Sequence, residues 1–128
     1  MPNEIWVKIV QIHSGTFIDS TVARSVTKQI HQAITIGRDS GNDIQFLYSF
    51  ISGQHSRIFV EQGFFTEHLD YEDYSTYGSN IVRWSKAECK IDFVHKKKTK
   101  IKPGDWIIIA YNDDTGIANG ILLIPYIR

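Results

Sequence analysis

Cysteine and long apolar runs are scarce or absent in this sequence, and each scarcity narrows what the protein can be. One cysteine, Cys89, stands among 128 residues, so no disulfide framework can form within the chain, and a reducing compartment such as the cytoplasm suits it. We expect Cys89 to be a buried packing residue. No apolar run approaches the roughly 18 residues that cross a bilayer. The first residues contain no basic segment followed by an apolar core, so no signal peptide is predicted.

Net charge is also missing, because 14 lysines and arginines balance 14 aspartates and glutamates. This balance gives no general attraction to nucleic acid or to a membrane surface. The one strong local charge is the basic run HKKKTKIK, residues 95–102. Such a run is typical of a solvated sheet edge or hairpin, where lysines discourage strand association. Two alternatives stay open: nucleic-acid contact, with Trp84 and Tyr77 stacking on bases, and attraction of acidic residues beside a bound peptide.

Short alternating or apolar segments make up most of the chain, with turn residues between them. A hydrophobic content of 42% is ordinary for a globular chain, and we expect one domain over residues 1–128. Segment 20–33 fits a helix or a strand, and segment 70–79 is expected to be a loop. The other segments predict an all-β sandwich of about ten to eleven strands. The expected strands are 5–12, 34–36, a run from 44, 57–60, 63–69, 80–84, 89–95, 106–111 and 117–127.

The central stretch, residues 34–59, carries the candidate site. An apolar strand, ITI, breaks at GR (37–38), where glycine permits a sharp turn and places a guanidinium at the lip of a sheet. A polar turn follows and leads into NDI (42–44), whose side chains are expected to fix the turn by hydrogen bonds to the backbone. The segment SGQH (52–55) then precedes the next strand.

These three motifs, in this order and at this spacing, resemble the forkhead-associated (FHA) domain, a module that binds phosphothreonine. A further segment, DYSTYGS (73–79), resembles the family's loop Asp-x-Ser-x-Asn-Gly-Thr. The resemblance implies a β-sandwich with binding loops at one end and a strand within 20–33. It also implies a partner protein that a Ser/Thr kinase has phosphorylated on threonine.

Phosphate binding is expected from Arg38, Ser52 and Thr76. A phosphothreonine carries a charge of about −1.5 to −2 and three acceptor oxygens, so its reader needs cations and clustered donors. The Arg38 guanidinium offers a planar fork of donors and Ser52 offers a hydroxyl, while the resemblance assigns a phosphate contact to Thr76. The alternative for Arg38 is a surface ion pair with Asp39 or Asp43.

The peptide-contacting positions depart from the family pattern. Tyr77 stands where the family has asparagine, and its phenol offers one hydroxyl in place of an amide that both donates and accepts. Gly53 lacks the polar side chain that often follows the family's serine. The resemblance still places Gly53 and Tyr77 against the peptide. Structural support of the site is expected from Gly37, Asn42, His55, Ser75 and Gly78.

Motifs for catalysis or metal binding are absent from the sequence. We find no zinc-protease, nucleophile-elbow or phosphate-loop motif, and the turn at 39–43 lacks the closing glutamate of a calcium loop. We therefore expect no enzyme activity, no metal and no cofactor. Ser75 has a simpler alternative role, a local turn hydrogen bond. A second functional hypothesis keeps the fold without the phosphate: a scaffold domain with a degenerate pocket, as in bacterial secretion machines, which Tyr77 favours.

Overall fold

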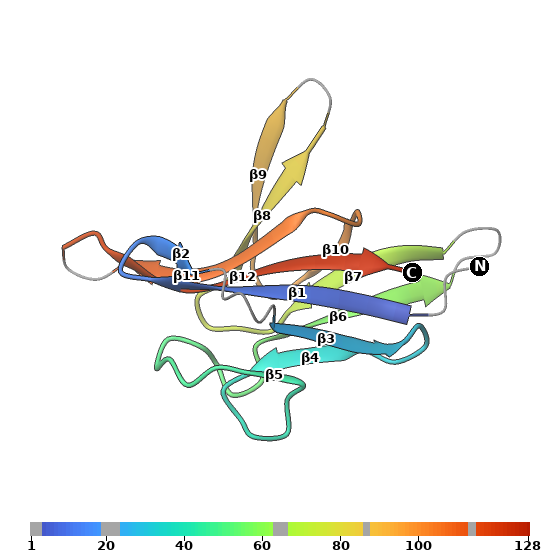
Figure 1. The fold of residues 1–128 in the computed structure, drawn as a ribbon, viewed down its shortest axis with the longest axis horizontal. Helices are drawn as coiled ribbons and strands as arrows, with labels where there is room; N and C mark the ends of the chain where they lie inside the picture. Colours follow the sequence, from blue (N-terminus) through green and yellow to red (C-terminus); the bar gives the residue numbers. More distant parts are fainter. Residues whose placement is uncertain (1–3, 19–23, 63–66, 86–87, 113–114) are drawn as a thin grey trace.

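The computed structural model describes residues 4–18, 24–62, 67–85, 88–112 and 115–128, and the structural statements below concern these residues. They form strands joined by turns and loops, so the predicted all-β class is confirmed (Figure 1). No helix capable of crossing a membrane occurs in the described part of the chain. The described strands are β1 (Glu4–His13), β2 (Thr16–Ile18), β3 (Arg24–Gln29), β4 (Ile34–Gly37), β5 (Ile44–Gln45), β6 (Ser56–Gln62), β7 (Glu67–Asp73), β8 (Ser79–Trp84), β9 (Cys89–Val94), β10 (Lys98–Ile101), β11 (Trp106–Asn112) and β12 (Ala118–Ile127).

One sheet has seven strands, in the order β2-β1-β12-β11-β8-β9, with β3 also paired to β1. Strands β1 and β12 are neighbours in its interior and are antiparallel. Ile5, Val7 and Ile9 are all buried, which confirms the face that the alternation of β1 predicts. The ambiguous segment 20–33 contributes β3, which confirms the strand over the helix. Residues 20–23 lie outside the described ranges.

The second sheet has five strands, in the order β10-β7-β6-β4-β5, and it carries the candidate site. Its pairings are antiparallel except that of β4 with β5, where Ile36 lies opposite Ile44 in a parallel pair. The chain therefore doubles back through residues 38–43 before β5 begins. This return loop contains the arginine of the candidate site.

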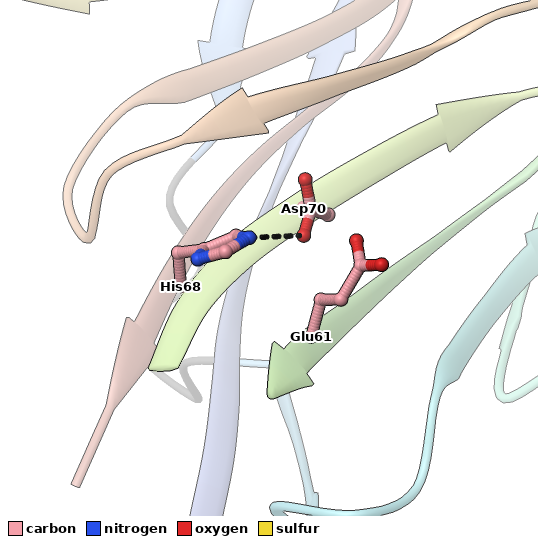
Figure 2. Close-up of side chains that lie close together, drawn as sticks. All are labelled: Glu61, His68 and Asp70. Atoms are coloured by element: carbon pink, nitrogen blue, oxygen red, sulfur yellow. Dashed lines mark ion pairs between the residues drawn. The ribbon is translucent and has the colours of Figure 1, made fainter. Parts of the chain in front are cut away.

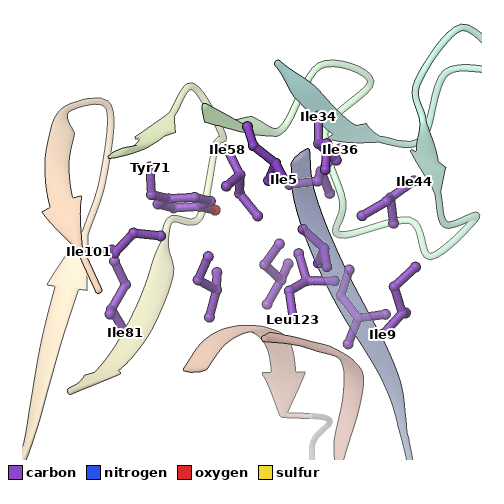
Figure 3. Close-up of a cluster of buried hydrophobic side chains, with 14 of the residues drawn as sticks. Ile5, Ile9, Ile34, Ile36, Ile44, Ile58, Tyr71, Ile81, Ile101 and Leu123 are labelled. Carbon is purple, nitrogen blue, oxygen red and sulfur yellow. The ribbon is translucent and has the colours of Figure 1, made fainter. Parts of the chain in front are cut away.

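The facing sides of the two sheets pack into one core, in which isoleucine predominates (Figure 3). Isoleucine is stiff at its branched Cβ and packs well on a pleated surface, which favours strands over helices here. The core fixes the strand ends from which the site loops emerge. Its buried members include Ile5, Ile34, Ile36, Ile58, Tyr71, Ile81, Ile107 and Leu123.

Three sequence-based expectations need correction. Residues 70–73 belong to β7 and not to a loop, because the inward alternation of Leu69 and Tyr71 continues to a buried Asp73. Cys89 is exposed, since it lies on an edge strand. The sequence does not predict β2, which has three residues, or β10, which has four and is rich in lysine. Of the expected strand 63–69, residues 63–66 lie outside the described ranges.

The basic run lies at a sheet edge, as expected. Its residues Lys98–Ile101 form β10, the edge strand of the five-stranded sheet. The ammonium of Lys98 lies 3.0 Å from a carboxylate oxygen of Glu61 on β6. Part of the run's charge is therefore neutralised within the protein, which weakens the nucleic-acid alternative.

Candidate functional site

Backbone hydrogen bonds tie the loops at one end of the five-stranded sheet together. The N–H of Arg38 donates to the carbonyl of Ser52 at 3.0 Å, and the N–H of Asp39 donates to the carbonyl of Gly53 at 3.2 Å. The N–H of Tyr74 donates to the carbonyl of His55 at 2.8 Å. Segments that carry Arg38, Ser52 and Tyr74 in the sequence are thereby held side by side in space.

Asn42 and Gly37 let the first two of these loops approach each other. The Asn42 side-chain amide donates to the carbonyls of Asp39 and Gly53, at 3.0 and 2.9 Å. The structure thus confirms that this turn is fixed by side-chain to backbone bonds. A Cβ at Gly37 would overlap the carbonyl oxygen of Gly53, so glycine is required there by close approach.

Ser52 and Thr76 meet across the two loops. The N–H of Thr76 donates to the Ser52 hydroxyl at 3.1 Å, and the Ser52 hydroxyl lies 3.4 Å from the Thr76 hydroxyl. Two residues that stand 24 positions apart thus present their hydroxyls at one point. Donors clustered in this way are what a phosphate group needs.

The Arg38 guanidinium is exposed, and its Nη1 donates to the carbonyl of Ser49 at 3.4 Å. Among the described residues, no ion pair joins Arg38 to Asp39 or Asp43, so the surface-pair alternative is not what the structure shows. Asp43 is instead paired with Lys28 at 2.9 Å. Although burial partly opposes the effect, the backbone bond from Thr35 and the Lys28 ammonium hold the pKa of Asp43 below its usual range.

Asp73 holds the loop that carries Thr76, a role that is not among those expected from the sequence motifs. Its carboxylate is 1% exposed and accepts from the Ser75 backbone at 3.0 Å, from the Ser79 hydroxyl at 2.7 Å and from the Lys96 backbone at 3.1 Å. The Ser75 hydroxyl also donates to Asp73, and it accepts from the Gly78 N–H at 2.7 Å. Ser75 therefore makes the local turn bond that was its simpler alternative. The sequence feature that could have indicated this role is the spacing of Asp73 from two serines, Ser75 two residues later and Ser79 six residues later.

Ser79, which replaces the family's threonine, joins this network to the core. The hydroxyls of Ser79 and Tyr71 lie 2.6 Å apart. Burial raises the pKa of the Tyr71 phenol, so the phenol stays protonated and can donate to this network at neutral pH. The substitution of serine for threonine thus keeps the hydroxyl that the loop uses.

His55 is buried beneath the loops, with 1% of its surface exposed. Its ring Nδ1 lies 2.9 Å from the Ser56 hydroxyl, and its backbone N–H donates to the carbonyl of Ile36 at 2.9 Å. Burial lowers the pKa of the imidazole, an effect that the nearby Asp73 carboxylate partly opposes. These partners lie within the protein and place the ring beneath the loops, the geometry expected of a structural histidine.

Tyr77 is 60% exposed and begins a row of aromatic rings. Its ring centroid lies 5.9 Å from that of Tyr111, which lies 5.7 Å from Phe50, and Phe50 lies 5.2 Å from Tyr48. The next residue, Gly78, has a φ of 83°, a conformation that favours glycine. The family's asparagine position is thus joined to an aromatic surface.

A cluster with potential metal ligands lies among residues of β6 and β7 (Figure 2). One ligand atom from each of Glu61, His68 and Asp70 lies within 4.8 Å of the others. Burial raises the pKa of Asp70, and its Oδ2 lies 3.7 Å from the His68 Nε2. Lys98 already supplies positive charge to Glu61 at 3.0 Å, so part of the negative charge of this cluster is neutralised within the protein.

Comparison with known protein families places the chain. A family model described as the FHA domain matches residues 34–110, more than half of the sequence. The chain therefore belongs to the FHA domain family. Among curated proteins, no sequence relative is found.

Solved structures of FHA domains share the fold. The N-terminal FHA domain of Rad53p from S. cerevisiae, solved with a phosphothreonine peptide, superposes with a TM-score of 0.61 at 16% identity, covering 95% of this chain and 93% of that one. The MEK1 FHA domain gives a TM-score of 0.62 at 15% identity, with 95% and 89% coverage. The FHA2 domain of Rad53, solved with a phosphotyrosyl peptide, gives 0.66 at 15% identity, with 96% and 77% coverage. At these identities the likeness shows the fold alone.

Proposed function

We propose that this protein is a phosphothreonine-dependent interaction module, in which Arg38, Ser52 and Thr76 hold the phosphate. The observation that carries the proposal is the meeting of two hydroxyls from separate loops, with the Thr76 N–H 3.1 Å from the Ser52 hydroxyl. The N–H of Arg38 is bonded to the carbonyl of Ser52 at 3.0 Å, so the backbone that carries the guanidinium is tied to the same loop. A guanidinium and clustered hydroxyls on one edge match the charge and the acceptors of a phosphate.

Gly53 and Tyr77 meet the peptide that carries the phosphothreonine. Gly53 follows Ser52 directly and presents no side chain of its own, and the exposed Tyr77 ring continues into the aromatic row. The partner is a protein phosphorylated by a Ser/Thr kinase, and a cytoplasmic location belongs to the same proposal. The module binds and does not catalyse, and it uses no cofactor.

A titration against a degenerate phosphothreonine peptide library tests the proposal, with matched unphosphorylated peptides beside it. Arg38→Ala is the test variant, and Arg128→Ala is its matched control, because Arg128 is an exposed arginine paired with Glu4. We expect binding that requires both the phosphate and Arg38 and that ignores Arg128. Binding that is indifferent to phosphate and to Arg38 would overturn the proposal.

Phosphate-independent docking is the second candidate function, and Tyr77 favours it. A large exposed ring that contacts Tyr111 gives a partner apolar area in place of an amide's hydrogen bonds. A groove of about 370 Å³ lies against the far end of the aromatic row, lined by Gln11, Gln45, Phe46, Leu47 and Tyr48. In this case a partner would bind equally well with and without phosphorylation, and Tyr77→Ala would weaken it more than Arg38→Ala.

A further inference from the structure

The β8–β9 hairpin projects from the body of the sandwich (Figure 1). Strand β9 is the edge of the seven-stranded sheet, and no other described strand pairs with its outer side. Its Ile91 and Phe93 side chains are 65% and 56% exposed, and Trp84 on β8 is 49% exposed. Proteins usually blunt such edges with charge. The other sheet does so with the lysines of β10, whereas β9 presents large apolar side chains.

The register of the hairpin puts these side chains on one face. Residues that lie directly opposite each other in an antiparallel pair share a face. Ile91 lies opposite Val82 and Cys89 lies opposite Trp84, and Phe93 is on the same face two residues from Ile91. On the next strand, Trp106 lies opposite Val82. This face is therefore apolar along β9 and inward through Val82, Trp84 and Trp106, while the polar Asn80 lies opposite Phe93.

The other face of β9 carries the charges. The Asp92 carboxylate lies 2.6 Å from the Arg83 Nε and 3.8 Å from the Lys90 Nζ. The strand thus alternates: Cys89, Ile91 and Phe93 point to the apolar face, while Lys90 and Asp92 lie on the charged face. Lys90 and Asp92 are placed symmetrically about Ile91 and carry opposite charges.

We propose that two copies of this chain associate by antiparallel pairing of their β9 strands, centred on Ile91. In this register Ile91 lies opposite Ile91 of the second copy, Lys90 lies opposite Asp92, and Cys89 lies opposite Phe93. Apolar side chains then meet apolar ones on one face, and opposite charges meet on the other. Such a pairing is self-complementary, as a two-fold interface requires.

Neighbouring registers lack this complementarity. Centring the pair on Lys90 places lysine opposite lysine, and centring it on Asp92 places aspartate opposite aspartate, arrangements that are destabilising in a sheet. The charge pattern of β9 therefore selects a second copy of the same strand in one register. This inference concerns an edge that is separate from the phosphate loops and does not depend on the proposed function.

Sedimentation velocity on the full chain, over a wide concentration range, measures the association. We expect Ile91→Lys to weaken it by about tenfold or more, because a like-charged pair replaces the apolar contact at the two-fold axis. Lys100→Asp on β10 is the matched control for a charge change at an edge and should leave the association unchanged. Circular dichroism confirms that each variant is folded.

Charge reversal tests the register independently. Lys90→Asp and Asp92→Lys should each weaken self-association, since each brings like charges together. Mixing the two variants should restore it, because every pair across the strands then has opposite charges. A wild-type chain that stays monomeric at all concentrations would overturn the proposal, and so would a dimer that ignores both Ile91→Lys and the charge reversals. Association with an unrelated strand in place of a second copy would appear as a heteromeric complex without self-association, which also overturns it.

A disulfide gives the geometric check. In a Cys89→Ser background, Ile91→Cys should form an intermolecular disulfide under mild oxidation, because opposed Cβ atoms lie about 4.5–5.5 Å apart in such a pair. The wild-type Cys89 should not, since the register separates it from Cys89 of the second copy. Crosslinking of Cys89 with none at position 91 would contradict the register.

Discussion

The two loop systems of the candidate site are built differently, although each presents a hydroxyl to the same point. The loops that carry Arg38 and Ser52 are joined by backbone bonds and by the Asn42 amide. The loop that carries Thr76 has one buried carboxylate, that of Asp73, as the acceptor of several of its bonds. The first system distributes its support over several bonds to neutral groups, and the second gathers most of its buried bonds on one charged residue.

This difference affects which positions of the site can be substituted without loss of loop structure. In both systems a buried side chain makes the hydrogen bonds that fix the loop, Asn42 in the first and Asp73 in the second, whereas the outward positions differ from the family pattern at Gly53 and Tyr77. A loop whose interior is fixed can replace an outward side chain without losing its shape. The phosphate-facing geometry and the peptide-facing chemistry are therefore separable by mutation.

Removal of the Asp73 carboxylate should have the largest effect. Asp73→Ala leaves the N–H groups of Ser75 and Lys96 and the Ser79 hydroxyl without their acceptor, at about 1–3 kcal/mol for each buried donor. We expect the free energy of unfolding to fall by about 3 kcal/mol or more, as measured by urea unfolding. Glu4→Ala, which removes an exposed carboxylate, should cost about 1 kcal/mol or less. A loss of that smaller size for Asp73→Ala would contradict the contrast between the two loops.

Removal of the Arg38 guanidinium should affect binding and leave stability unchanged. The loss of a charge-assisted phosphate contact is expected to cost about 1.5–3 kcal/mol, or roughly 10- to 150-fold in Kd by calorimetric titration. The free energy of unfolding should stay within about 0.5 kcal/mol, since the side chain is exposed. The affinity of Arg38→Lys should lie between those of the wild type and Arg38→Ala, because an ammonium keeps the charge but loses the planar fork of donors. Equal affinity for all three proteins would show that the guanidinium does not touch phosphate.

Protonation of His55 should loosen the junction between the two loop systems. Burial lowers its pKa below the usual 6.5, so the unfolded chain binds a proton more readily than the folded one. The free energy of unfolding should therefore fall as pH drops below 6.5 and level off below the folded pKa, by at most about 1.4 kcal/mol per pH unit. His55→Gln should lack this component when both proteins are unfolded in urea between pH 7.5 and 5. Parallel pH profiles would refute the assignment.

Restoring the family's amide at position 77 should strengthen phosphopeptide binding. An asparagine side chain can donate to and accept from a peptide backbone, so Tyr77→Asn should gain about 1 kcal/mol, or roughly fivefold in Kd. Tyr77→Phe keeps the ring without the amide and should show no such gain. If Tyr77→Asn instead weakens binding, the aromatic row itself contacts the partner.

Neutralisation of Asp39 should have the smallest effect on phosphopeptide affinity. Its carboxylate lies against Gly53, where a Cβ would come within 2.7 Å of its oxygens. Neutralisation by Asp39→Asn should tighten phosphopeptide binding by about two- to threefold at low salt, and the gain should shrink as salt screens the charge. Titrations at two salt concentrations provide the measurement. A gain that does not depend on salt would point to a cause other than repulsion.

Much of the fold could be predicted from the sequence because its signals are local. The alternation of Ile5, Val7 and Ile9 specifies one face of β1, and ITIGR specifies a strand that ends in a turn. The extension of β7 to Asp73 could not be predicted. An aspartate in a sequence indicates an exposed position, and only the tertiary structure shows the donors that allow this one to be buried. Strand β10 likewise becomes a strand only through its pairing with β7.

The residues of the candidate site that belong to a family motif could be predicted from the sequence. The contacts between segments distant in the sequence could not. Arg38, Ser52 and Thr76 follow from the family motifs, and their phosphate roles stay predictions. The contact of Tyr77 with Tyr111 depends on how β11 lies beside the loop, which no local pattern shows. The prediction that Cys89 is buried was wrong for a similar reason. Edge strands and interior strands can show the same alternation of apolar and polar residues, so the sequence does not tell them apart.

Backbone amide NMR during titration with one phosphothreonine peptide selected from the library tests the central claim most directly. The account predicts that the N–H signals of Ser52, Gly53, Thr76 and Tyr77 shift together with the phosphorylated peptide. They should not shift with the unphosphorylated peptide or in Arg38→Ala. Shifts confined to one of the two loop systems, or shifts that do not require the phosphate, would contradict the claim that both loops hold it.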